Sequence, residues 1–277
     1  MNSLFERGVI FLKLIKQIWF LYIILLIFLA MTLIFYIYSI NNKQTHLISI
    51  YSNAVFHLRS LFSDDEKSRS VEVDNARIQE IELDIPLIRQ KPKLARGCEV
   101  TSLAMLLQSA GKPVSKMTLA KQIRKVPYIQ NGLHGDPNEE FVGEMYAFKR
   151  PGYGVYHKPL AELASRYLPN QIEDQTGKPF VSILDQLRKE IPVVVITNTS
   201  FKSLPKKSFI SWQTRKGNVK ITFHEHAVLI TGFTDDKIYI NNPLGGKNEE
   251  LNRNDFEKAW RQMGKQAISY SIPMRNK

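Results

Sequence analysis

An uncharged apolar segment near the N-terminus is the feature that most restricts how this chain can fold. No charged side chain occurs between Lys16 and Lys43, and 15 of the 23 residues at 18–40 (IWFLYIILLIFLAMTLIFYIYSI) are Leu, Ile or Phe. A helix of this length reaches about 35 Å, which is enough to cross a hydrocarbon core of about 30 Å. We therefore predict a single transmembrane helix over residues 18–40.

A cleaved signal peptide is the alternative interpretation of this segment. Its apolar region is normally about 7 to 15 residues long and is followed by small residues at a cleavage site. The segment here is longer, and the sequence YSINN that ends it lacks small residues in that pattern. Arg7, Lys13 and Lys16 precede the segment and only Lys43 follows closely, so we expect residues 1–17 to form a cytoplasmic tail. The prediction is a single-pass protein of the cell membrane with its folded domain outside the cytoplasm.

Residues 41–80 are predicted to form a stem between the membrane and the folded domain. Apolar residues within 46–62 recur at helical spacing, whereas residues 63–80 are polar and charged without periodicity. The helical part could be an amphipathic helix that packs on another part of the protein, or a stripe for self-association. We expect the folded domain to occupy residues 81–277.

Composition excludes several classes of protein. The single cysteine, Cys98, rules out an internal disulfide, a CxxC redox pair and an all-cysteine zinc site. The net charge of +12 is spread along the chain, and no helix-turn-helix or aromatic single-strand motif accompanies it, so we expect no nucleic-acid partner. No cofactor is predicted, and no Walker A motif is present.

Helical patterns dominate the first half of the expected domain and strand patterns the second half. We predict helices at 98–110, 115–126, 159–167, 181–190 and 255–263, and strands at 192–197, 210–214, 221–233, 237–241 and 267–272. This order is typical of an α+β fold.

Cys98 and His226 are the candidates for chemistry. Cys98 follows Gly97 and opens an apolar helix, where the positive end of the helix dipole favours the nucleophilic thiolate. His226 begins an apolar strand and could take the thiol proton. Each residue alone could equally be a buried structural residue. His224 is a rival base, and the H-x-H pair could bind a metal, but no third-ligand pattern accompanies it, so no metal is predicted.

Two amides could complete such a site. Asn242, in the sequence INNP, could hold the imidazole in the required tautomer, although Asn-Pro alone is a turn signal. Gln90, eight residues before Cys98, could form an oxyanion hole with the Cys98 backbone N–H, although alone it is an ordinary loop residue.

The chain resembles the family-39-like cysteine peptidases, papain-fold relatives of the domains that remove double-glycine leaders from bacteriocins. The resemblance covers residues 83–272 and is strongest at residues 90–107 (QKPKLARGCEVTSLAMLL), 135–145 (GDPNEEFVGEM), 225–233 (EHAVLITGF) and 239–243 (YINNP). It implies a papain-like peptidase domain in which Cys98 is the nucleophile, His226 the base, Gln90 the oxyanion glutamine and Asn242 the orienting residue. Asn242 departs from the aspartate expected in these families. Glu99 also matches; it could hold the active-site entrance, or its charge could favour the helix N-terminus, and we expect the second.

The function implied is a thiol peptidase that acts on a peptide or protein at the cell surface through a covalent thioester. The same thioester could be passed to an amine, which would make the protein an acyltransferase or transpeptidase. A non-catalytic peptide-binding domain is the third possibility. The sequence alone does not decide among the three.

Overall fold

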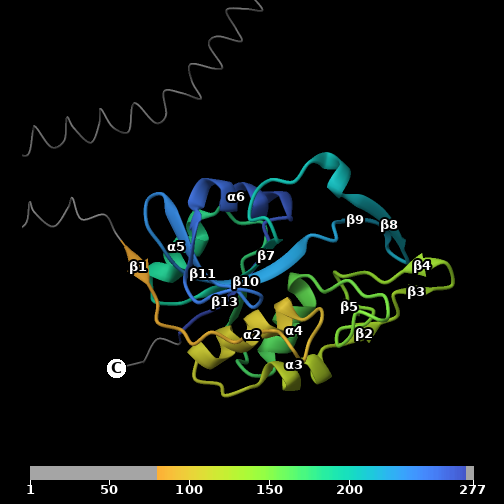
Figure 1. Cartoon of the computed structure of the whole chain (residues 1–277). Coiled ribbons are helices and arrows are strands. Elements are labelled where there is room, and N and C mark those ends of the chain that lie inside the picture. Colours follow the sequence, from red (N-terminus) through yellow and green to blue (C-terminus); the bar gives the residue numbers. More distant parts are fainter. Residues whose placement is uncertain (1–79, 273–277) are drawn as a thin grey trace, which may run out of the picture. The chain divides into compact units, whose positions relative to one another are not determined.

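An antiparallel seven-stranded sheet forms the centre of the fold. The computed structural model describes residues 80–272, which lie within one compact unit of the chain, Arg77–Lys277. Strand β1 (Ile81–Glu82) pairs with one end of β10. The other strands follow the order β12 (Glu249–Asn252), β11 (Lys237–Asn241), β10 (Glu225–Phe233), β7 (Val193–Asn198), β13 (Ala267–Tyr270) and β6 (Ile172–Asp174) (Figure 1).

The two central strands, β7 and β10, are covered on both faces. Successive side chains of a strand point to opposite faces of the sheet. On β7, Val193 and Val195 belong to the apolar core of one face, while Val194 and Ile196 belong to the core of the other. Continuous apolar sequence in these strands therefore reflects burial on both sides, and the sheet requires helices on each face.

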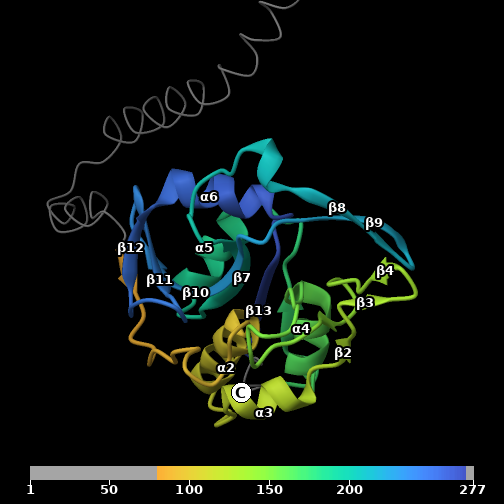
Figure 2. The same cartoon turned by 45° about the vertical axis from the view of Figure 1, so that its right-hand side comes forward.

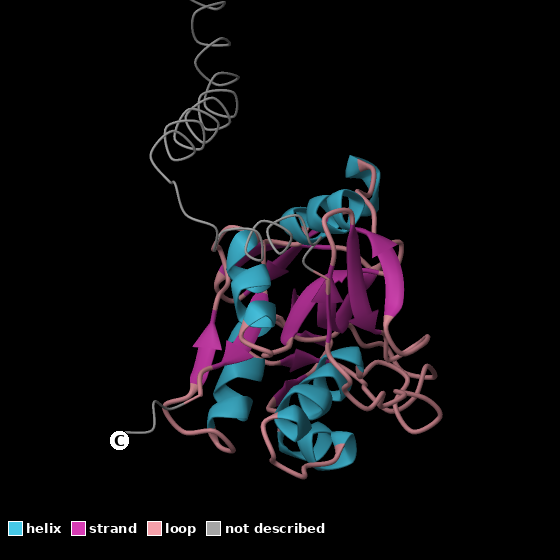
Figure 3. Cartoon of the chain, turned by 90° about the vertical axis from the view of Figure 1, so that its left-hand side faces the viewer, coloured by secondary structure: helices cyan, strands magenta, loops and turns pink. Residues whose placement is uncertain are grey.

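Helices form a layer on each side of the sheet. Helix α2 (Cys98–Ser109) packs on β10 and β7, with α3 (Lys116–Gln122) and α4 (His157–Ser165) beside it. Helices α5 (Val181–Arg188) and α6 (Arg253–Gln262) cover the opposite face (Figure 2). Figure 3 shows the strands between these two groups of helices. Residues 98–107 of α2 are all buried, so its N-terminus lies inside the protein.

Small strands form a periphery that packs against the main domain. β2 (Lys125–Val126) and β5 (Phe141–Val142) pair in parallel, and β3 (Ile129–Gln130) forms a hairpin with β4 (Leu133–His134). A second hairpin consists of β8 (Ile210–Thr214) and β9 (Gly217–Ile221). The His134 ring stacks on the buried Trp212 ring with centroids 4.1 Å apart, and Trp212 in turn contacts Tyr153. This aromatic cluster attaches both hairpins to the segment before α4.

The mixture of helices and strands agrees with the α+β expectation, and most predicted elements occur within a few residues of their expected bounds. Two predictions were wrong in detail. The helix capped by Ser115 ends at Gln122 rather than 126, because the chain turns extended at Ile123 and pairs as β2 with the buried β5. The strand predicted over 221–233 is interrupted at residues 222–224, where the Glu225 N–H donates to the Thr222 carbonyl and closes a turn.

The predicted membrane anchor lies in a part of the chain that the structure does not describe. Among residues 80–272, no helix is both long and apolar enough to cross a bilayer. The predicted tail at 1–17, the predicted span at 18–40 and residues 41–79 of the predicted stem lie outside the described residues.

Candidate active site

Cys98 is the first residue of α2 and lies against the start of β10. Ser102, one turn further along the helix, donates to the Ala227 carbonyl at 3.2 Å, and the Ala227 backbone also hydrogen-bonds the thiol. The side chain of Cys98 is 7% exposed. A Cβ at Gly97 would lie 2.7 Å from the Leu94 side chain, so close packing requires glycine before the cysteine. The space at Gly97 is thus filled by Leu94.

His226, the second residue of β10, is held by Asn242. Its Nε2 lies 2.9 Å from Asn242 Oδ1, and only 2% of the residue is exposed. Asn242 Oδ1 also accepts the Leu244 N–H, while Asn242 Nδ2 donates to Glu249 Oε2 at 2.9 Å. These partners identify the amide oxygen, so His226 Nε2 carries the proton and Nδ1 is left with a lone pair. The imidazole is therefore prepared to accept a proton at Nδ1.

Glu249 and Gly245 support Asn242 from behind and were not singled out in the sequence. Glu249 lies on the edge strand β12, accepts from the Asn242 side chain and also accepts from the Gly246 N–H. A Cβ at Gly245 would lie 2.1 Å from Glu249 Oε1 and 2.7 Å from Asn242 Nδ2, so this turn excludes any larger residue. Position 242 holds an asparagine where the resemblance leads us to expect an aspartate. Glu249 supplies a carboxylate that contacts this asparagine.

Cys98, His226 and Gln90 line one cavity of about 160 Å³. The remaining lining residues are Ala95, Arg96, Phe148, Gly152, Tyr153, Phe223, Glu225 and Leu244. The exposed His224 does not line this cavity, which removes the rival base from the site. The structure thus brings together three predicted residues around one space and connects the fourth, Asn242, to His226.

Gln90 is fixed in this cavity by the backbone on both sides. Its N–H donates to the Pro243 carbonyl at 2.9 Å, and its side-chain Nε2 donates to the Ala95 carbonyl at 2.8 Å. An amide nitrogen carries two hydrogens, so the bond to Ala95 uses one and leaves the other. Gln90 is only 2% exposed, and its Oε1 has no partner among the described residues.

Two carboxyls lie beside the thiol, that of the buried Glu99 and that of the half-buried Glu225. The Cys98 thiol donates to Glu99 Oε2 at 3.4 Å, and Glu99 Oε1 accepts the Val155 N–H at 2.8 Å. Burial, then the charges of Glu99 and Glu225, raises the pKa of the Cys98 thiol well above its ordinary value. Burial also raises the pKa of Glu99. Burial opposes the charged form of Glu99, whereas hydrogen bonds from its own backbone N–H and from the Val155 N–H favour it, so stabilisation of the helix N-terminus by its charge stays a prediction.

The resting site holds an uncharged cysteine and an uncharged histidine. Burial lowers the pKa of His226, although the bond to Asn242 and the charge of Glu249 oppose this effect. Together with the raised pKa of Cys98, this favours an uncharged thiol and an uncharged imidazole in the same cavity. The sequence suggested that the helix N-terminus would favour a thiolate. In the structure, burial and the neighbouring carboxyls outweigh that effect. A proton must move from sulfur to imidazole when a substrate is attacked.

The cluster beside the thiol has side chains of the types that bind cations. Cys98, Glu99 and Glu225 offer ligand-type atoms within 4.8 Å of one another. Burial raises the pKa of all three groups and so disfavours the charged forms that would bind a cation, and we assign no metal to them.

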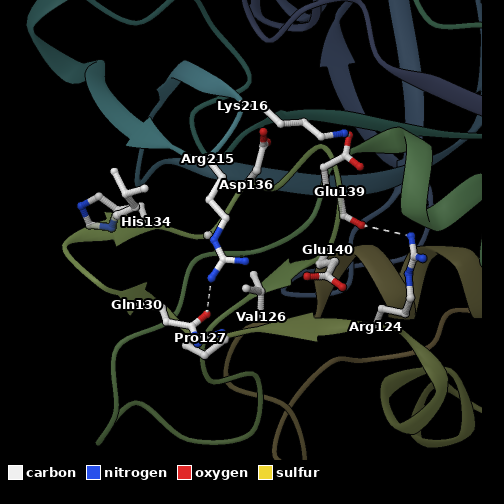
Figure 4. A pocket seen from close by; sticks show the side chains of 12 residues that line it. Arg124, Val126, Pro127, Gln130, His134, Asp136, Glu139, Glu140, Arg215 and Lys216 are labelled. Atoms are coloured by element: carbon white, nitrogen blue, oxygen red, sulfur yellow. Dashed lines mark hydrogen bonds and ion pairs between the residues drawn. The ribbon is translucent and has the colours of Figure 1, made fainter.

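A larger hollow lies away from Cys98, between the peripheral hairpins and the turn that precedes β5 (Figure 4). Its charged side chains largely satisfy one another. Lys216 pairs with Glu139 at 2.9 Å, and the Arg215 guanidinium donates to Gln130 Oε1 at 3.0 Å. Its lining includes His134 but none of the four candidate catalytic residues. The cavity at Cys98 is therefore the candidate active site.

Comparisons with known proteins identify the family of the chain. A family model described as the Peptidase_C39 like family matches residues 82–268, a range that contains all four candidate residues. YvpB of Bacillus subtilis (strain 168), described as uncharacterized, is 47% identical over 189 residues, which cover 67% of this chain and 74% of YvpB. A crystal structure from Bacillus anthracis, of a protein designated a C39-like peptidase, matches with a TM-score of 0.70 and 47% identity. It covers 70% of this chain and 98% of that chain.

Proposed function

Because the chain belongs to the Peptidase_C39 like family, we propose that it is a membrane-anchored cysteine peptidase that cleaves a peptide or isopeptide bond outside the cytoplasm. One observation carries the proposal. Cys98 and His226 line the same cavity, and the hydrogen bonds of Asn242 leave His226 Nδ1 free to accept the thiol proton. This is the arrangement that nucleophilic catalysis by a cysteine requires.

In the proposed reaction, the Cys98 sulfur attacks the substrate carbonyl while its proton passes to His226 Nδ1. The carbonyl oxygen becomes an oxyanion that accepts from the Cys98 backbone N–H and from the remaining Gln90 Nε2 hydrogen. The carbon–nitrogen bond then breaks, and the imidazolium protonates the leaving amine. Water, deprotonated by His226, attacks the thioester, and the sulfur leaves with its proton restored.

Apolar side chains at the mouth of the cavity support a peptide substrate. Phe148, Phe223 and Leu244 line the cavity and yet remain 66%, 62% and 45% exposed. Two of them are held by neighbouring side chains: Arg96 lies over the Phe148 ring at 4.9 Å, and Phe223 packs edge-on against Trp212. Exposed apolar residues that are held in place at a cavity are suited to contact substrate side chains.

Anchoring through residues 18–40 is part of the proposal and rests on the length and apolarity of that segment. If it is correct, the protein remains in the membrane pellet after carbonate extraction. Proteolysis of intact cells then removes the part after residue 43 while the tail at 1–17 is protected. Release by carbonate, or full protection of the domain, contradicts the anchor or its orientation. Self-association through the stem is a further possibility that crosslinking of intact cells would reveal.

The peptidase proposal is tested by incubating the detergent-solubilised full-length chain with peptides secreted by its host, in ¹⁸O-labelled water. Mass spectrometry of the products should show ¹⁸O at new C-termini with the wild type and no products with Cys98→Ala. Products that carry an added amine instead of ¹⁸O would indicate acyl transfer. Peptides that bind both proteins but remain intact would indicate a binding domain and would contradict the enzyme.

Replacing Glu249 with glutamine is expected to lower kcat/KM by about tenfold or more. The neutral amide cannot accept from both Asn242 Nδ2 and the Gly246 N–H as the carboxylate does, and a lost hydrogen bond to a charged group costs about 1.5 to 3 kcal/mol. Because the charge of Glu249 raises the pKa of His226, the acidic limb of the pH profile should also move to lower pH. Glu250→Gln, on the neighbouring exposed position of β12, is the matched control. An unchanged pH profile in Glu249→Gln would contradict this role.

A further inference from the structure

Glu225 has no role in the reaction described so far, although it lies beside the nucleophile. It precedes His226 at the start of β10 and lines the same cavity as Cys98. Oxygen atoms of Glu99 and Glu225 and the sulfur of Cys98 all lie within 4.8 Å of one another. The site therefore contains three acidic groups, of which catalysis uses one.

Gly154 provides the space in which the two carboxyls converge. A Cβ at this position would lie 2.4 Å from Glu99 Oε1 and 3.1 Å from Glu225 Oε2. The next residue, Val155, donates its N–H to Glu99 Oε1, so the backbone at this point stabilises one carboxylate oxygen. Glu225 receives no such support: its Oε1 is buried and has no hydrogen-bond partner among residues 80–272.

Two negative charges at this distance are unfavourable in a buried site. A buried carboxylate without hydrogen bonds carries a large desolvation penalty, and a second carboxylate nearby adds repulsion. Burial, and next the charge of Glu99, raises the pKa of Glu225 well above its ordinary value. The protonated acid is the form of Glu225 that this environment accepts.

Within residues 80–272, no cation contributes to the pKa shift of either carboxyl. Tyr153 and Tyr156 face Glu225, and burial raises the pKa of both, so they add no charge near neutral pH. Arg96 lines the cavity, but its guanidinium donates to the backbone carbonyls of Glu144 and Ala147. The charged or titratable groups near the thiol are thus Glu99 on α2, Glu225 and His226 on β10, with Glu249 behind Asn242.

We propose that Glu225, together with Glu99, forms a carboxyl pair that controls ionisation of Cys98, so that the thiol gives up its proton readily only while the pair retains one of its own. Each negative charge on the pair opposes a second negative charge on the sulfur. Glu225 is therefore a positioning residue that acts through Cys98. The thiol loses its proton most readily at pH values low enough for the pair to stay partly protonated. The effect on the thiol stands independently, and the consequence for catalysis rests on the proposed peptidase function.

Alkylation of Cys98 by iodoacetamide tests this proposal without a substrate. The thiol is the only cysteine of the full-length chain, so modification can be followed by intact mass across a pH series. In Glu225→Gln, we expect the alkylation midpoint to shift to lower pH by at least about one unit, because the pair can no longer gain its second charge as the pH rises. Glu99→Gln should shift the midpoint in the same direction, and Glu162→Gln, an exposed carboxylate on α4, is the matched control.

The outcomes separate this proposal from the peptidase proposal. A rate and midpoint equal to wild type in both Glu225→Gln and Glu99→Gln, with circular dichroism showing folded protein, would overturn it. A slower alkylation in Glu225→Gln would also overturn it, because the carboxylate would then be activating the thiol. If the midpoint shifts as expected but no peptide is cleaved, the carboxyl pair is supported and the peptidase proposal fails.

Discussion

Replacing His226 with alanine is expected to lower kcat/KM by about 10³-fold while the fold is retained. General base catalysis by a positioned imidazole contributes about 10² to 10⁴ in rate, and the raised pKa of Cys98 makes the thiol unusually dependent on a proton acceptor. The measurement is steady-state cleavage of a peptide identified with the wild-type protein, with circular dichroism to verify folding.

His224→Ala is the matched control for this substitution. His224 lies two residues earlier, is exposed, and does not line the cavity at Cys98. The backbone carbonyl of His224 bonds the Thr199 N–H, and the substitution leaves that bond in place. We expect nearly wild-type activity from His224→Ala. If His224→Ala were the inactive variant and His226→Ala the active one, the assignment of the base would be wrong.

The predicted residues were recoverable from the sequence because their signals are local. Cys98 sits at the junction of a glycine and an apolar helix, and His226 opens an apolar strand, so each pattern is contained in about ten residues. The resemblance then linked them to Gln90 and Asn242. In the structure, Cys98, His226 and Gln90 share one cavity. The fourth residue, Asn242, hydrogen-bonds His226.

The roles of Glu225 and Glu249 were not recoverable in the same way. In the sequence, Glu225 is an ordinary polar residue before a strand and Glu249 belongs to a charged stretch. Glu225 meets Glu99 only because α2 packs on β10, and Glu249 meets Asn242 only because β12 pairs with β11 along the sheet edge. Such contacts depend on tertiary pairing, which neither propensity nor spacing encodes. Tertiary pairing also shortened α3, where β2 joins β5 in place of a last helical turn.

Replacing Trp260 with alanine is expected to destabilise the domain by about 3 to 5 kcal/mol, the usual cost of deleting a large buried aromatic side chain. Trp260 lies on α6, has no exposed surface, and donates its Nε1–H to the Gln266 carbonyl at 2.9 Å. Its ring packs against Phe180 with centroids 5.3 Å apart, so it joins α6 to the segment that begins α5. Urea unfolding of the full-length chain followed by far-UV circular dichroism measures the change.

Phe223→Ala is the control for this stability effect, because Phe223 is also a large aromatic residue but is mostly exposed. The substitution is expected to change the free energy of unfolding by less than about 1 kcal/mol. Helix α6 follows directly after β12, the strand that carries Glu249. As the urea concentration rises, the activity of Trp260→Ala should fall in parallel with its folded fraction. Its kcat should remain normal where the variant is fully folded. A loss of less than about 1 kcal/mol in Trp260→Ala would mean that α6 does not stabilise this face of the sheet as its packing indicates.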